Sequence, residues 1–202
     1  MKFVKEIPAT DEKLSEKLVS EGWKKIKEPK NLLTATLASI PFMIINGICA
    51  ILITIRSSNP IVNIFNNGSF SVTIKILDII YFVIASFILI ILHELIHMIF
   101  IPNFIKSDKV YIGITLNGGF VDTTEKISKI RFIIISVMPL IILSVVFPLI
   151  LGVCNALGGF IMFLIIVNAA ASSVDILNVF LILFQAPKNS HIINNGFETY
   201  IK

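Results

Sequence analysis

The stretch Ile79–Ile101, IIYFVIASFILIILHELIHMIFI, is long and apolar enough to cross a membrane as a helix, yet its second half carries two histidines and a glutamate. A helix needs about 20 apolar residues to span the bilayer core. Each ionisable group held in the middle of a bilayer costs about 2.5–3.5 kcal/mol. His93, Glu94 and His97 therefore indicate a functional site, and a polar cluster that only joins helices by hydrogen bonds is the alternative.

The composition of the whole chain is that of a membrane protein. Of its 202 residues, 55% are hydrophobic and only 15% are charged, and the mean hydropathy is +0.90, which is unusual for a soluble domain. The net charge of +4 is unevenly distributed, so it bears on membrane topology and anionic lipids, and we expect no nucleic-acid partner. The polar first 31 residues contain no apolar core, so we expect no cleavable signal peptide.

We predict an all-α polytopic membrane protein with four transmembrane helices. The expected spans lie near residues 32–55, 79–101, 132–153 and 160–184 and together form a membrane domain over 32–184. A juxtamembrane segment over 1–31 precedes this domain, a cytoplasmic hairpin over 102–131 interrupts it, and a cytoplasmic tail over 185–202 follows it.

The distribution of Lys and Arg predicts the orientation of the chain. Residues 1–31 carry eight of them, 102–131 carry five and the tail carries two, whereas 56–75 carry two and the link after the third span carries none. Because basic residues collect on the cytoplasmic side, both termini and 102–131 should be cytoplasmic in a multi-pass protein of the cell membrane.

Two segments outside the spans have patterns of their own. In KVYIGITLNGGFVDTT, Lys109–Thr124, alternating apolar residues surround an Asn-Gly turn, which predicts a β-hairpin. In TDEKLSEKLVSEGWKKIKEP, residues 10–29, we expect a surface helix whose Leu14, Leu18 and Trp23 face the membrane. A solvated helix that leads into the first span is the alternative interpretation.

The histidine pair has the spacing of a metal site. His93 and His97 are four residues apart, so on a helix both rings lie on one face and can reach the same ion. Glu94 follows the first histidine, where it can act on a water held at the metal, as in the HExxH motif of zinc peptidases. Catalytic zinc needs a third protein ligand and one open position.

Asp175 is the best candidate for the third ligand, because it is the only acidic residue in another predicted span. It lies about 14 Å from the cytoplasmic end of the fourth span, and His93 lies about 12 Å from the same end of the second span. A lone buried aspartate also needs a partner, and a cation can serve as one.

Other assignments remain open. Glu125 in the hairpin segment and His191 in the tail are weaker ligand candidates, and Asn103 occupies the position where a metzincin has its third histidine. Asn168 lies on the helical face of Asp175, and we assign it to the catalytic set as a contact to substrate or oxyanion. The small residues between them also permit close helix packing, so this polar stripe can be structural.

The residues also resemble those of a known family. A polar segment ending in EPKN, HELIH in the second span, a β-like insertion and a late span with SSVD are similar to the bacterial membrane family named domain of unknown function 3267, described as "putative zincin peptidases". A more distant resemblance is to site-2 proteases, which are intramembrane metalloproteases. It implies that His93, His97 and Asp175 bind zinc, that Glu94 is the general base, and that Asn168 precedes the aspartate as theirs does. The chain departs from them in having VDI where Asp-Gly is typical and in lacking the proline between Asn168 and Asp175.

The resulting expectation is a zinc-dependent intramembrane metalloprotease that hydrolyses peptide bonds of membrane-associated substrates near the cytoplasmic face. Its partners would be membrane lipid and a membrane-protein or peptide substrate. The alternatives are a non-catalytic zinc-binding membrane protein and a small transporter that uses the cluster as a proton or metal relay.

Overall fold

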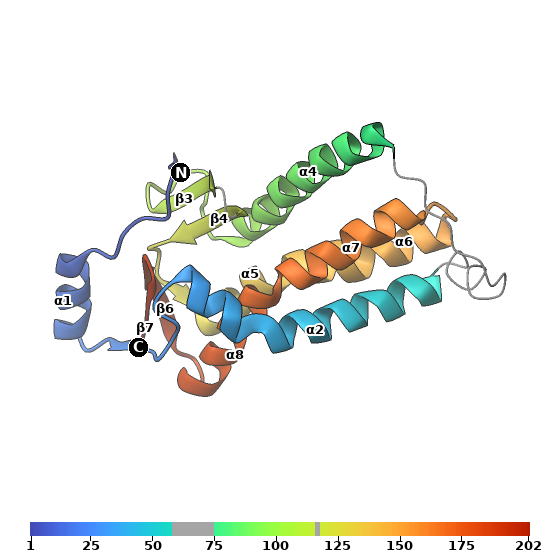
Figure 1. Ribbon diagram of the computed structural model, residues 1–202. Helices are drawn as coiled ribbons and strands as arrows, with labels where there is room; N and C mark the ends of the chain where they lie inside the picture. The colour runs from blue at the N-terminus through green and yellow to red at the C-terminus, as the bar shows by residue number, and fades with distance from the viewer. Residues whose placement is uncertain (58–74, 116–117) are drawn as a thin grey trace.

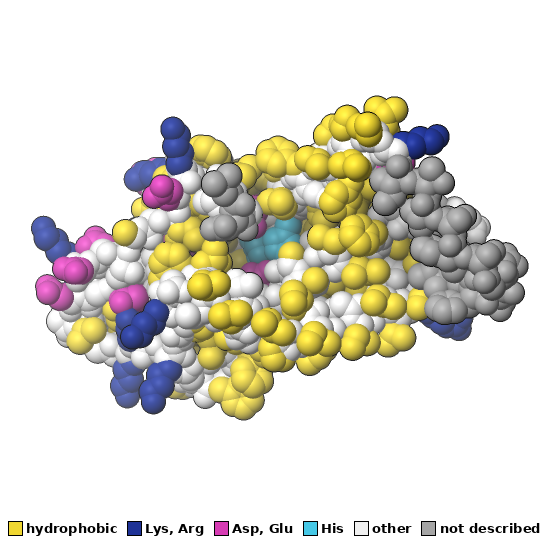
Figure 2. Space-filling view, viewed as in Figure 1, with side chains coloured by type: hydrophobic (Ala, Val, Ile, Leu, Met, Phe, Trp, Pro, Cys, Tyr) yellow, Lys and Arg dark blue, Asp and Glu magenta, His cyan; other side chains and the backbone are white. Residues whose placement is uncertain are grey.

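A computed structural model describes residues 1–57, 75–115 and 118–202. Four helical runs in it are long and apolar enough to cross a membrane, as the hydropathy of the sequence predicts. They are α2 (Leu32–Ser57), α4 (Ile76–Phe100), the run made by α5 (Lys129–Ile141), η1 (Ile142–Val146) and α6 (Phe147–Val153), and the run made by α7 (Gly159–Ala171) and α8 (Ser173–Gln185). Large apolar side chains cover much of the outer surface of these helices (Figure 2), as lipid contact requires.

Proline and small polar residues shape the third and fourth helical runs. Pro139 lies inside α5, and the next segment, η1, is π-helical. A proline cannot donate the helical hydrogen bond, and π-helical turns are frequent at functional sites. The fourth run is interrupted at Ser172, which is fully buried and donates through Oγ to Asn168 O at 2.9 Å. This interruption places Asp175 in the first turn of α8.

Two small sheets lie together at one end of the bundle, where both termini also lie (Figure 1). One sheet has the order β1-β3-β4, with β1 (Lys2–Phe3), β3 (Val110–Thr115) and β4 (Gly118–Thr123). The other has the order β2-β7-β6-β5, with β2 (Lys24–Lys25), β5 (Ile127–Ser128), β6 (His191–Asn195) and β7 (Glu198–Ile201).

These sheets correct the prediction of an all-α protein with a single hairpin. Antiparallel pairing of β3 with β4 does occur in the predicted hairpin segment. Residues 116 and 117, which include the asparagine of the predicted Asn-Gly turn, lie outside the described residues. The second sheet was missed because its strands come from three distant parts of the chain and are only two to five residues long. Such short strands depend on their pairing partners more than on local pattern.

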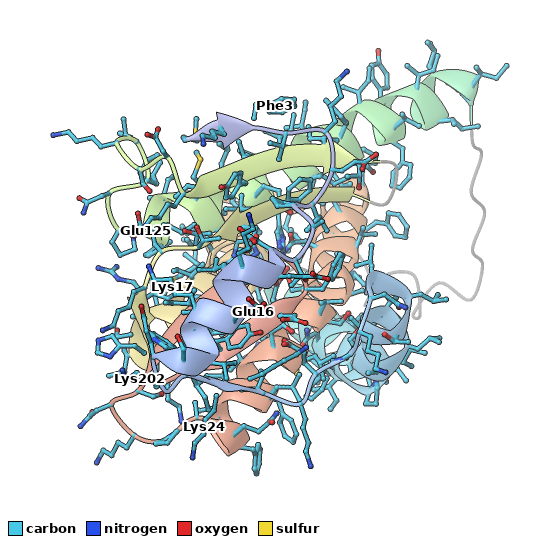
Figure 3. All side chains as sticks on the ribbon, turned by 90° about the vertical axis from the view of Figure 1, so that its left-hand side faces the viewer. Phe3, Glu16, Lys17, Lys24, Glu125 and Lys202 are labelled. Carbon is cyan, nitrogen blue, oxygen red and sulfur yellow. The ribbon has the colours of Figure 1, made fainter. Side chains whose placement is uncertain are left out.

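The N-terminal helix α1 (Glu12–Ser20) packs on the second sheet. Leu18 and Trp23, with exposed fractions of 3% and 6%, form a buried cluster with Tyr200 of β7. The prediction that Leu18 and Trp23 face the membrane is therefore wrong, because both side chains pack against protein. Figure 3 shows α1 in front of the sheets, with the side chains of Glu16 and Lys17 labelled on it.

Candidate metal centre

The structure brings together the three residues that were predicted as metal ligands. His93 and His97 lie one turn apart on α4, and Asp175 approaches them from α8. One potential ligand atom from each lies within 4.8 Å of the other two. Asp175 Oδ2 is 3.3 Å from His93 Nε2 and 3.5 Å from His97 Nε2. The alternative candidates do not join this cluster: Glu125 bonds to Ser107 and Lys109.

A backbone carbonyl of α5 orients His97. His97 Nδ1 lies 2.8 Å from the carbonyl oxygen of Ile135, and a carbonyl can only accept, so Nδ1 carries the hydrogen. The residue four positions after Ile135 is Pro139, which has no N–H to donate to that carbonyl. The proline in the third helix thus leaves a carbonyl available to the histidine of the second helix.

An asparagine orients His93 in the same way. Asn168 Nδ2 donates to Ser144 Oγ at 2.8 Å and lies 3.4 Å from the carbonyl oxygen of Pro139. The amide oxygen of Asn168 therefore faces His93 Nδ1 at 2.9 Å, and that nitrogen is a donor. Ser144 lies in the π-helical segment η1. Asn168 is 2% exposed, and it contacts a candidate ligand, whereas the sequence suggested a contact to substrate.

These hydrogen bonds determine what the cluster can bind. With Nδ1 protonated in both rings, each Nε2 has a free lone pair, and both lone pairs converge on the carboxylate of Asp175. Three acceptors in so small and buried a space require a shared proton or a metal cation. Two imidazoles and a carboxylate are a common donor set for catalytic zinc, and hydrogen bonds from Nδ1 to acceptors are typical of zinc-bound histidines. The residues therefore fit the zinc that the sequence predicts.

Glu94 lies next to this cluster but is not one of the three clustered residues. Its carboxylate takes part in no hydrogen bond among the described residues, and the side chain is only partly buried. Gly119 of β4 packs directly against Glu94. The approach is so close that a Cβ added at Gly119 would lie 2.5 Å from Glu94 Cγ. No pattern in the sequence indicated this contact, which links the hairpin segment to α4.

A cleft of about 980 Å³ connects the cluster to the two sheets. Its walls come from α2, α4, α7, α8, β4 and the strands of the C-terminal tail. Figure 2 shows the histidine side chains at the bottom of a hollow in this face, with acidic side chains next to them. The candidate metal centre is therefore buried among the helices and accessible from one side.

Comparison with known proteins agrees with these observations. A family model, domain of unknown function 3267, with the description "Putative zincin peptidase", matches residues 86–191, just over half of the chain. The matched range contains His93, His97, Asn168 and Asp175. No curated protein and no solved structure matches the chain.

Proposed function

The chain belongs to the family described as "Putative zincin peptidase", and from this premise we propose that it is a zinc-dependent intramembrane metallopeptidase. It would hydrolyse peptide bonds of membrane-associated substrates near the cytoplasmic face. One observation carries the proposal: the Nε2 lone pairs of His93 and His97 converge on the Asp175 carboxylate in an open cleft. Beside them lies Glu94, whose carboxylate makes no hydrogen bond with any residue that the structure describes. Zincins are named for the zinc they bind, and zinc is the cofactor that this donor set fits.

His93, His97 and Asp175 would hold the ion, and Asn168 and the Ile135 carbonyl would hold the two rings in the ligating orientation. When bound, zinc supplies Lewis-acid chemistry, since it polarises a carbonyl oxygen and makes water more acidic. Asn168 thus acts here as a positioning residue, because both ends of its amide are engaged by protein atoms.

Glu94 is the proposed general base. It follows the first candidate ligand on α4 and lines the cleft, so its carboxylate is available to a water in the cleft. It would accept a proton from the water that attacks the peptide carbonyl, and it would pass this proton to the leaving amine as the C–N bond breaks.

The edge of β4 is the proposed binding site for the peptide. Among the described residues β4 pairs only with β3, and five of its residues, Gly118–Asp122, line the cleft. A transmembrane helix hides its carbonyls in its own hydrogen bonds, so it must unwind before it can be cleaved. An extended segment can then pair with the free edge of β4, as peptides do when they add a strand to a sheet.

The distribution of charge supports the proposed orientation in the membrane. Both termini lie at the end of the bundle that carries the sheets (Figure 1), and the segments at this end hold fifteen of the seventeen Lys and Arg residues. We therefore place this end in the cytoplasm and the protein in the cell membrane. Partners would be lipid and a membrane-protein or peptide substrate.

The test compares the purified wild type with Glu94→Gln for zinc content and for cleavage of a library of single-span membrane peptides. We expect equal zinc in both proteins and cleavage by the wild type alone. Glu16→Gln, an exposed change on α1 (Figure 3), is the matched control and should retain activity. Equal zinc without cleavage by the wild type would instead favour a non-catalytic zinc protein, and zinc carried across the membrane in vesicles would favour a transporter.

A further inference from the structure

At the sheet end of the cleft, two buried hydrogen-bond acceptors have no donor among the residues that the structure describes. Asp122 of β4 is only 9% exposed, and its Oδ2 accepts no hydrogen bond among the described residues. Asn194 of β6 also has a buried, unpaired Oδ1. Both residues line the same cleft as Glu94. Buried acceptors without a partner are rare and destabilising. Both oxygens are closed off from solvent, but their residues line the cleft, so a ligand in the cleft would supply the missing donors once the two side chains turn toward it.

These acceptors belong to one continuous group. Asn194 Nδ2 donates to Asp122 Oδ1 at 3.5 Å, which links β4 of the first sheet to β6 of the second. Thr199 of β7 is the register partner of Asn194, so their side chains are neighbours. Thr199 in turn donates to Glu28 from its backbone N–H at 2.6 Å and from Oγ1 at 2.8 Å. Glu28 also lines the cleft, and it adds a second carboxylate to this end of the cleft wall.

The charge of the cleft is one-sided. Its described wall contains the carboxylates Glu28, Glu94, Asp122 and Asp175 and neither lysine nor arginine, although the chain has 17 Lys and Arg residues against 13 Asp and Glu residues. The two histidines contact Asp175 at the candidate metal centre. No cationic side chain of this wall therefore neutralises Asp122. Burial raises the pKa of the Asp122 carboxyl above its usual range, as expected for a carboxylate without a cation.

We propose that Asp122 and Asn194 form a subsite for a basic side chain, lysine or arginine, of the peptide substrate. This inference rests on the proposed peptidase function. The N–H groups of an ammonium or guanidinium ion would satisfy both unpaired oxygens, and its charge would compensate Asp122. A divalent ion is a poorer match: calcium takes about six to eight oxygen ligands, and the Glu28 oxygens already accept from Thr199.

The position of the subsite on β4 predicts where the basic residue lies in the substrate. Gly119 packs against Glu94, and Asp122 lies three residues further along the same strand. A strand rises about 3.3 Å per residue, which separates the two positions by about 10 Å. A peptide paired with β4 would therefore carry its basic residue about three residues from the cleaved bond. Membrane proteins have excess Lys and Arg beside the cytoplasmic ends of their spans, so such substrates are common.

The test measures peptide binding and does not depend on cleavage. In Glu94→Gln protein held in lipid nanodiscs, the affinity for a labelled, N-acetylated apolar peptide with one lysine is compared with that for the same peptide carrying glutamine. We expect the lysine peptide to bind about tenfold tighter, as for a hydrogen bond to a buried charge. Adding Asp122→Asn should remove this difference, because the variant has no carboxylate charge with which the lysine can pair. Adding Asp108→Asn, an equal charge change at an exposed site outside the cleft, should have no effect.

A second variant protects the test against misfolding. Asn194→Ala removes the other unpaired acceptor, and its donor to Asp122, without a change of charge. We expect it to weaken lysine binding by a smaller factor while the protein still unfolds in one cooperative transition. Equal binding of the lysine and glutamine peptides by the Glu94→Gln protein would overturn the proposal. Loss of the lysine preference in Asp108→Asn would also overturn it. A third contrary result would be calcium at millimolar concentration displacing the lysine peptide from the Glu94→Gln protein but not from the protein that also carries Asp122→Asn. If the lysine preference holds but the wild type cleaves nothing, the subsite stands and the peptidase proposal fails.

Discussion

Replacing Pro139 with alanine should weaken zinc binding while it strengthens the fold. In the wild type, Pro139 has no N–H, and the carbonyl of Ile135 accepts from His97 Nδ1 at 2.8 Å. An alanine at 139 would donate its N–H to this carbonyl in the ordinary helical pattern. The histidine would then compete with the helix for one acceptor and lose part of the bond that holds its ring and tautomer.

The two effects have opposite signs and measurable sizes. Loss of a neutral hydrogen bond costs about 1 kcal/mol, which corresponds to about a fivefold loss of zinc affinity, and changes in groups that orient metal ligands reach about 10- to 100-fold. Removing a proline from a helix interior stabilises the helix by up to about 3 kcal/mol. We therefore expect Pro139→Ala to bind zinc about five- to tenfold more weakly and to unfold at a higher temperature without metal.

Competition against a chromophoric chelator measures the zinc affinity, and thermal unfolding of the metal-free protein in detergent measures the stability. Pro41→Ala is the matched control, because Pro41 also lies inside a membrane helix but has no histidine bonded to the carbonyl four residues before it. It should be stabilised with unchanged zinc affinity. An unchanged zinc affinity in Pro139→Ala, or an equal loss in Pro41→Ala, would refute the role assigned to the proline.

Three further predictions concern the rest of the site. Asn168→Leu should lower zinc affinity about 10- to 100-fold in the same chelator assay, and an unchanged affinity would remove its positioning role. Gly119→Ala would place a Cβ 2.5 Å from Glu94 Cγ, so we expect kcat to fall with zinc content unchanged, whereas Gly47→Ala, with no neighbouring atom within 4 Å, should retain full activity. Because burial raises the pKa of Asp122, the folded state holds this proton at pH values where the unfolded chain has lost it. Stability should therefore fall as pH rises from the usual carboxyl pKa through the raised one, and Asp122→Asn should unfold with a smaller dependence on pH over that interval.

Local patterns in the sequence were enough to predict the four helices that are long and apolar enough to cross a membrane, and the residues that meet at the site. The length and hydropathy of the four runs do not depend on their neighbours, so the helices were predicted correctly. The spacing of His93 and His97 is a property of one helix. That Asp175 lies at about the same depth in the membrane as His93 follows from counting residues from the cytoplasmic end of each span. The structure brings these three side chains together.

Features that depend on distant contacts were not predicted. The strands of the second sheet pair residues from the N-terminal segment, the loop before α5 and the tail, and no local window contains these partners. The carbonyl of Ile135 is a backbone atom without a residue-type signal, although a proline four residues after it in a membrane span is a cue that could have found it. The burial of Asp122 depends on packing between the two sheets, so no pattern within the hairpin segment indicates it.

The central claim is that His93, His97 and Asp175 hold zinc while Glu94 does not, and metal analysis of the purified protein tests it most directly. Wild type and Glu94→Gln should each contain one equivalent of zinc, and X-ray absorption at the zinc edge should show nitrogen and oxygen neighbours without sulfur. His97→Ala and Asp175→Asn should lose most of the metal while unfolding as cooperatively as the metal-free wild type. Wild type without zinc, or full zinc in both ligand variants, would contradict the account.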